Sequence, residues 1–171
     1  AQGAELLHAP AEVQYGIISP YPDEWNSFHS NQNSTGIYAT QDSTTQDLLH
    51  ALVNWAHNNK GDKQSVLLLI DDLESFIKLN QRAEQDLRWL LLRGPSRRVW
   101  PIITINSSRA QNIKGWLGSF RPRLFGCTQD SNDAQLLTGN SKSTLNQLIS
   151  GSQFTMREGN NWLNFWVPSI D

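Results

Sequence analysis

The chain has 171 residues, a length typical of one domain that is large enough to bury a sizeable core. Its 14 basic and 16 acidic side chains give a net charge of -2, which argues against nucleic-acid binding through a broadly basic surface. The single cysteine, Cys127, cannot form an internal disulfide, and no apolar run approaches the roughly 20 residues that span a bilayer. We therefore expect one domain, residues 1–171, in the cytoplasm and without a membrane segment.

Strands and helices alternate along the first hundred residues. Short β-rich segments flank helical patterns, and one continuously apolar run is typical of a strand that is covered on both faces. Ser43 and Gln46 have the spacing of a capping box at the start of the clearest helix. The expected strands are 12–18, 35–40 and 65–71, and the expected helices are the end of one over 2–9, then 44–58 and 73–93.

The alternation continues to the C-terminus, where the pattern changes. Strands are expected at 99–106 and 123–128, and helical segments at 108–118 and 130–138. Two apolar runs then flank "EGNN" (158–161), which predicts a β-hairpin. The whole pattern predicts an α/β fold with three layers and a mostly parallel sheet, to which a C-terminal β-hairpin is added.

Two acids, Asp71 and Asp72, follow the apolar run "SVLLLI" directly. Ligands of open α/β sheets gather at the carboxyl ends of the strands, where these acids are expected. A carboxylate there can hold a water of a magnesium ion, and a second one can orient the water that attacks a phosphate. The alternative is structural, because Asp72 could cap the helix that follows it.

Asn106 ends the next buried strand, "PIITIN", and two serines follow it. In a parallel sheet its side chain would lie beside Asp71, where a polar group can sense the γ-phosphate of a nucleotide. The alternative is again a cap, for the helical segment after Ser108. The sequence leaves both interpretations open.

The order of four segments resembles the motor domain of FtsK/HerA-type translocases, and is most similar to the ATPase modules of type VII secretion motors. These segments are "LLLIDDLESF", "LRWLLLRGPSRRVWPIITINSSRA", "FRPRLFGCTQDSNDAQLLTG" and "FWVPSID", which together cover most of the chain by order and spacing. The resemblance implies a P-loop fold of the RecA type. It also implies that Asp71 binds the magnesium of a nucleotide, that Asp72 and Asn106 act in catalysis, and that Arg123 occupies the position of a functional arginine.

Two features depart from the pattern of that family. Asp72 stands where active members usually have Glu, and the chain contains no G-x-x-x-x-G-K-[ST] loop for the phosphates. The segment "TGNSKST" (138–144) has the wrong spacing for this loop and is expected to be a polar surface loop. The resemblance places the true loop before Ala1, so the fold is expected to be incomplete at the N-terminus.

The resemblance implies Mg²⁺ and ATP as cofactors of the complete domain, and no cofactor for this chain alone. As partners it implies a homo-oligomeric ring and a transported substrate, either DNA or protein. The alternative is a degenerate, non-catalytic module that makes contacts within a larger assembly. Without the strand that precedes the phosphate loop, the strands 99–106 and 123–128 would have open edges. We expect one of three repairs: pairing of these strands with each other, which is the simplest, insertion of the C-terminal hairpin, or pairing with a second copy of the chain.

Overall fold

The computed structural model describes residues 13–59, 63–77, 81–158 and 161–168. The chain divides into two compact units, Ala1–Ile105 and Asn106–Asp171, and each is treated separately below. The expected end of a helix at 2–9 lies outside the described residues. The assignment of the whole chain to one domain stays a prediction.

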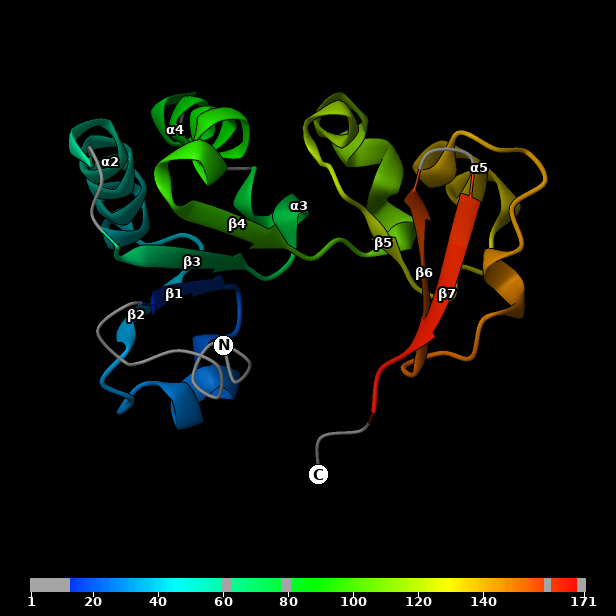
Figure 1. The fold of residues 1–171 in the computed structure, drawn as a ribbon, viewed down its shortest axis with the longest axis horizontal. Helices are drawn as coiled ribbons and strands as arrows, with labels where there is room; N and C mark the ends of the chain where they lie inside the picture. The colour runs from blue at the N-terminus through cyan, green and yellow to red at the C-terminus, as the bar shows by residue number, and fades with distance from the viewer. Residues whose placement is uncertain (1–12, 60–62, 78–80, 159–160, 169–171) are drawn as a thin grey trace. The chain divides into compact units, whose positions relative to one another are not determined.

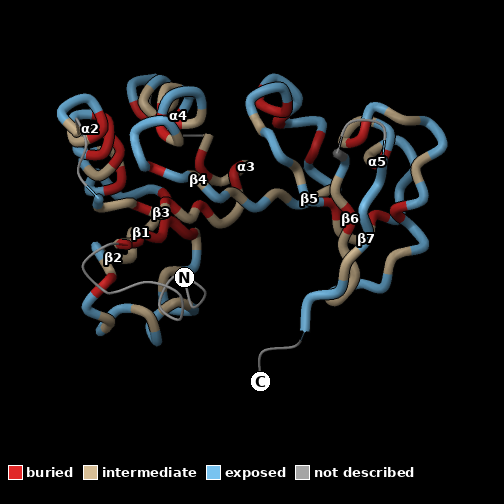
Figure 2. Tube along the Cα trace, viewed as in Figure 1, coloured by how far each residue is buried: buried red, intermediate tan, exposed pale blue. Residues whose placement is uncertain are grey.

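The first unit contains a sheet of four parallel strands in the order β2-β1-β3-β4 (Figure 1). All four strands match expected segments, although β4 ends three residues earlier than the sequence pattern predicts. The two central strands are the most buried, as the red trace of β1 and β3 shows (Figure 2). The strand bounds are Val13–Ser19 (β1), Ser34–Ala39 (β2), Ser65–Ile70 (β3) and Val99–Ile103 (β4).

The two faces of this sheet are covered differently. Helices α2 (Ser43–Asn58) and α4 (Gln81–Arg93) pack against each other on one face, where a side chain at Gly16 would meet Leu48 of α2. On the other face, the ring of Tyr15 packs edge-on against Phe28 of the 3-10 helix η1 (Pro22–Phe28). Layers on both sides of a parallel sheet confirm the α/β class.

Two local predictions are wrong in detail. The cap of α2 is Asp42, whose side chain accepts a hydrogen bond from the N–H of Thr44, so Ser43 does not begin a capping box. The helix expected over 73–93 is not continuous, because α3 (Leu73–Phe76) ends at Ile77 and α4 begins at Gln81. The intervening residues 78–80 lie outside the described part of the chain.

The second unit contains an antiparallel sheet in the order β5-β6-β7, in which β6 and β7 form the expected hairpin. Its small core contains Phe125, Ala134 and Leu145, against which Leu137 and Leu148 pack. The 3-10 helix η3 (Ser107–Ser119) lies next to α5 in this unit. The other bounds are Leu124–Phe125 (β5), Ser131–Thr138 (α5), Gln153–Glu158 (β6) and Asn161–Trp166 (β7).

The simplest of the three expected repairs, direct pairing of the strands 99–106 and 123–128, is wrong. β4 pairs with β3 alone among the described strands, and β5 pairs with β6 of the hairpin. The outer edge of β4 is poor in donors, because Pro101 has no N–H and the N–H of Val99 already bonds the carbonyl of Gly94. This edge therefore does not need a neighbouring strand to satisfy a row of amides.

No helix in the described part of the chain combines the length and the apolar character that a membrane span requires.

Gly94 is placed where no other residue fits. It connects α4 to the turn before β4, and a Cβ at this position would lie 2.4 Å from the carbonyl oxygen of Leu90 and 2.8 Å from that of Val99. Both obstacles are backbone atoms, so Gly94→Ala should lower the free energy of unfolding by about 2 kcal/mol in urea denaturation. Gly115→Ala is the control, since nothing lies within 4 Å of its added Cβ. An equal effect of both variants would contradict this account.

Hydrogen exchange should follow the direction of each amide in β3 and β4. Thr104 donates to Ile70, so Ile102 and Thr104 direct their N–H groups toward β3 while Ile103 directs its N–H to the open edge. We expect slow exchange at 66–70, at Ile102 and at Thr104, and fast exchange at Ile103 in NMR experiments. Uniformly slow exchange along β4 would mean that another strand covers this edge.

Candidate functional site

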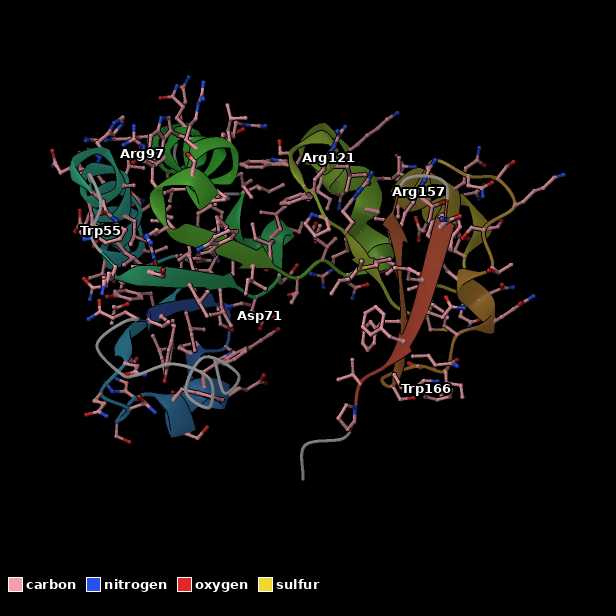
Figure 3. All side chains as sticks on the ribbon, viewed as in Figure 1. Trp55, Asp71, Arg97, Arg121, Arg157 and Trp166 are labelled. Carbon is pink, nitrogen blue, oxygen red and sulfur yellow. The ribbon has the colours of Figure 1, made fainter. Side chains whose placement is uncertain are left out.

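Three polar side chains meet at the carboxyl ends of the parallel strands. Ser19 is the last residue of β1, Asp71 follows β3, and Thr104 follows β4. The pairing of the backbone continues past the strands, since Asp71 donates its N–H to Ile18 (2.8 Å) and Thr104 donates to Ile70 (3.0 Å). Figure 3 labels Asp71 at this end of β3. The parallel register therefore brings one side chain from each of three neighbouring strands to the same edge.

The carboxylate of Asp71 is held by two hydroxyl groups. Ser19 Oγ donates to Asp71 Oδ2 over 3.1 Å, and Thr104 Oγ1 donates to Asp71 Oδ1 over 3.0 Å. Ser19 is fully buried, whereas Asp71 is half-buried. Each carboxylate oxygen accepts one of these bonds, so the two bonds together restrict the rotation of the carboxylate about its Cβ–Cγ bond.

Backbone amides set the direction of both hydroxyl groups. The N–H of Tyr21 donates to Ser19 Oγ at 3.0 Å, and the N–H of Asp72 donates to Thr104 Oγ1 at 2.9 Å. A hydroxyl that accepts an N–H bond can use its single hydrogen for another acceptor. For both hydroxyl groups that acceptor is the carboxylate of Asp71. Two series of hydrogen bonds therefore run from a backbone N–H through a hydroxyl group to Asp71.

Asp72 has an unusual backbone conformation, with φ 60° and ψ 86°. Positive φ raises the conformational energy of any residue with a Cβ atom, although Asp tolerates it better than most residues. Its Oδ2 accepts a bond from Ser75 Oγ at 2.9 Å, and its side chain makes no capping bond to the helix that follows. The capping interpretation of Asp72 is therefore wrong, and its proposed role in positioning water stays a prediction.

The site fits a hydrated magnesium ion better than a bare one. Mg²⁺ prefers oxygen ligands and usually keeps several of its waters, and a carboxylate oxygen with one hydroxyl bond still has a free lone pair for such a water. In the part of the chain that is described, no group of three His, Cys, Asp or Glu side chains could hold a metal directly, and no ion pair involves Asp71. The role of Asp71 in holding Mg²⁺, through one of the waters of the ion, stays a prediction.

The other two candidates, Asn106 and Arg123, belong to the second unit and make structural bonds there. Asn106 Oδ1 accepts from the N–H of Ser108 at 3.1 Å and from its hydroxyl at 2.8 Å, so this side chain is the cap of η3. Arg123 donates to the carbonyl of Leu137 at 2.8 Å, near the C-terminus of α5. Their roles in catalysis stay predictions.

An aromatic ring and two neighbouring arginines surround the positive charge of Arg123. Its guanidinium lies 5.8 Å from the centre of the Phe125 ring. Burial and the neighbouring charges of Arg121 and Arg157 lower the pKa of Arg123 below the usual range for arginine. Arginine nevertheless remains charged in proteins, so Arg123 is a cation held against a helix end, where the carbonyl dipoles are favourable to it.

The segment 138–144 is the surface loop that its spacing predicts. Gly139 ends α5 in a left-handed conformation (φ 70°), and the N–H of Lys142 bonds the side chain of Asn140. A helix leads into this loop, whereas a phosphate-binding loop follows a strand. The segment does not have the geometry of a phosphate cradle.

Ser19 and Thr104 are the site residues that sequence reasoning missed. Their signal was available, since each lies at or just after the end of a strand that neighbours β3. Because carboxyl ends of parallel strands share one edge, a hydroxyl at such a position is a candidate partner for Asp71. The choice of Asn106 overlooked that Thr104, two residues earlier, already lies at that edge.

Ser19→Ala should lower the free energy of unfolding by about 1–2 kcal/mol, since it removes the donor to Asp71 and the acceptor for Tyr21. In an Asp71→Asn background the cost should shrink, because the charged acceptor is already gone. Ser43→Ala is the control, since this exposed serine bonds only weakly to Asp42, at 3.4 Å. Chemical denaturation of the four variants measures the coupling, and additive effects would contradict the hydroxyl–carboxylate bond.

No protein-family model and no curated protein matches the sequence. Several solved structures match the fold, and three of them are ATPase structures of EccC and EssC. The cytoplasmic domain of the type VII secretion ATPase EccC from Thermomonospora curvata has a TM-score of 0.74 at 10% identity, over 96% of this chain and 23% of that one. EccC (ATPases 2 and 3) from the same organism, in complex with a signal sequence peptide, has a TM-score of 0.70 at 13% identity, over 96% of this chain and 32% of the other.

The third structure is EssC (ATPases 2 and 3) from Geobacillus thermodenitrificans, with a TM-score of 0.73 at 12% identity. The match covers 93% of this chain and 34% of EssC, so the chain spans about a quarter to a third of the length of these structures. At such identities the agreement concerns the fold. The resemblance seen in the sequence is confirmed at that level: this chain has the fold of the ATPase domains of the type VII secretion proteins EccC and EssC.

Proposed function

We propose that this chain is part of the ATPase domain of an FtsK/HerA-like motor and contributes the magnesium-binding carboxylate of its nucleotide site. The observation that supports this most is Asp71, which lies at the carboxyl edge of a parallel sheet and is oriented by a hydroxyl group on each of its two oxygens. A carboxylate held this way does not have to be ordered when a metal binds. The fold shared with EccC and EssC is consistent with the same role.

Each residue of the site has a distinct part in this proposal. Asp71 holds Mg²⁺ or one of its waters, and Asp72 orients the attacking water from the adjacent position. Bound Mg²⁺ neutralises charge on the phosphates and favours their transfer. Ser19 and Thr104 hold Asp71 in place. The proposal assigns the phosphate-binding loop to a segment that this sequence does not contain.

The proposal assigns protein, not DNA, as the transported substrate. The neighbours are secretion ATPases by name, and the chain has a net charge of -2, which does not favour a nucleic-acid track. A cytoplasmic location and a homo-oligomeric ring complete the proposal, as the resemblance implies. Nothing in it requires this chain to hydrolyse ATP by itself.

A second function is favoured by particular bonds. Asn106 and Arg123 are both engaged in holding helices of the second unit, and Asp72 is one methylene shorter than the Glu of active family members. In a module of this kind, the side chains at the catalytic positions stabilise the fold and do not act on a nucleotide. Such a module would only make contacts within an assembly. Nucleotide measurements separate this alternative from the motor.

The isolated chain should bind ATP with Mg²⁺ no more tightly than millimolar in calorimetry, because phosphate affinity in such folds comes from loop amides and a lysine. A protein extended by the residues encoded before Ala1 should hydrolyse ATP, and Asp71→Asn should reduce kcat by roughly 10- to 100-fold. Asp47→Asn, an exposed acid on α2, is the control.

The three possible results lead to different conclusions. Full activity of the extended Asp71→Asn protein would remove Asp71 from the mechanism. An extended protein that binds no nucleotide would support the non-catalytic module instead. Micromolar binding by the isolated chain would reveal a phosphate site within it, and residues 139–144 would be the first place to look.

A further inference from the structure

The outer edge of β7 has no neighbouring strand in the described part of the chain, where the sheet ends in the order β5-β6-β7. The strand is six residues long and largely exposed. Its apolar side chains include Trp166, which is 63% exposed, and Leu163, which is 43% exposed. Trp166 lies near the C-terminal end of this strand (Figure 3). A long, apolar and unpaired edge is a surface that recruits another strand.

Two hydrogen bonds show which backbone groups of β7 face this edge. Val167 donates its N–H to Ser152 at 2.8 Å, and the carbonyl of Leu163 accepts the hydroxyl of Thr155 at 3.1 Å. In an antiparallel pair, every second residue directs both of its backbone groups to the same neighbour. The odd-numbered residues of β7 therefore bond β6. The N–H and C=O groups that face outward belong to Trp162, Asn164 and Trp166.

β7 also lacks the features by which proteins protect their edges. Residues 161–167 contain no charged side chain and no proline. The edge of β4 provides the contrast, since Pro101 lies on its outward side and the N–H of Val99 is already bonded. The other edge of the β7 sheet is β5, which is only two residues long. Within the described part of the chain, β7 is thus better suited than β4 or β5 to accept a partner.

We propose that β7 pairs with β7 of a second copy of the chain, antiparallel and centred on Asn164. About a two-fold axis at Asn164, the outward groups match: Asn164 faces Asn164 of the second copy, and Trp162 faces its Trp166. Three outward N–H groups from each copy then find carbonyl partners on the other. The same register places Leu163 opposite Phe165 of the second copy.

Side chains support this occupant over an unrelated peptide. Two Trp–Trp pairs form on one face and two Leu–Phe pairs on the other, and cross-strand pairs of this kind stabilise sheets by up to roughly 1 kcal/mol each. No like charges meet, because the paired strands carry none. The Asn164 amides, which can both donate and accept, face each other at the centre.

The size of the contact limits its strength. Two paired strands of six residues bury less than the roughly 1,200 Å² of a stable standard interface, so the dimer should be weak and depend on concentration. The contact uses the same strand on both copies and is closed by two-fold symmetry. Because β5 is too short to pair in the same manner, association through the edges of this sheet should stop at two chains.

Charge substitution at the centre of the contact tests the proposal. In sedimentation experiments the wild-type chain should form dimers at high micromolar concentration. Asn164→Lys and Asn164→Asp should each weaken the dimer at least tenfold, because like charges then face each other directly. An equimolar mixture of the two variants should restore dimers. Asn54→Lys is the matched control, since Asn54 is exposed on α2 in the other unit.

A cysteine pair tests the register in a Cys127→Ser background. Asn164 and its copy form a hydrogen-bonded pair, whose Cα atoms lie about 5.5 Å apart, within the range of a disulfide. Asn164→Cys should therefore crosslink on mild oxidation. Asn161→Cys should not, because its copy lies six residues along the paired strands, roughly 20 Å away.

Several results would overturn the proposal. A wild-type chain that stays monomeric at all concentrations leaves no role for a second copy, and a peptide or another protein would then be the occupant of this edge. A dimer that survives both charge variants uses another surface. Failure of the mixture to dimerise, or equal crosslinking at 161 and 164, would show that the register is wrong.

Discussion

The first unit depends on the position of β3, which is hydrogen-bonded to a parallel strand on each side. A strand in this position cannot shift its register without breaking both ladders, and its alternate residues, including Leu68 and Ile70, are buried against the helices. The residue that follows β3 therefore has a fixed position between the ends of β1 and β4. Asp71 is the residue delivered there, and its neighbours across the edge are determined by the same pairing.

The arrangement around Asp71 illustrates how a carboxylate can be ordered without an ion pair. Its two hydroxyl partners are themselves fixed by backbone amides, so the whole chain of bonds depends on the sheet and on the first turns after the strands. Neutral donors leave the negative charge intact, whereas a lysine or arginine would compensate it. A charge that is oriented but uncompensated suits a cation that arrives later.

Of the four edges of the described sheets, those of β4, β5 and β7 differ in their backbone groups and side chains. β4 is nearly devoid of outward amides, β5 is too short to pair further, and β7 presents outward amides and carbonyls between exposed aromatic side chains. These differences follow from local features, namely one proline, one turn and the absence of charge over seven residues. They decide where another chain can add to the protein, independently of what happens at Asp71.

The sequence by itself determined the elements and the acid pair. Apolar runs and helical spacing located β1 to β4, α2 and the hairpin, because burial on one or two faces imposes a period that is visible in the residues. The position of Asp71 at a strand end followed from the same pattern. The resemblance of segment order to secretion ATPases also anticipated the fold that the solved structures share.

The tertiary structure decided the contacts. Ser19 and Thr104 are 52 and 33 residues from Asp71, and only the strand order makes them its partners. Local sequence patterns do not determine which strands pair, because pairing joins residues far apart in the chain. The sequence therefore did not indicate that β5 pairs with the hairpin and not with β4. The left-handed backbone of Asp72 likewise has no signal in the sequence, and its N–H bonds the hydroxyl of Thr104, 32 residues away.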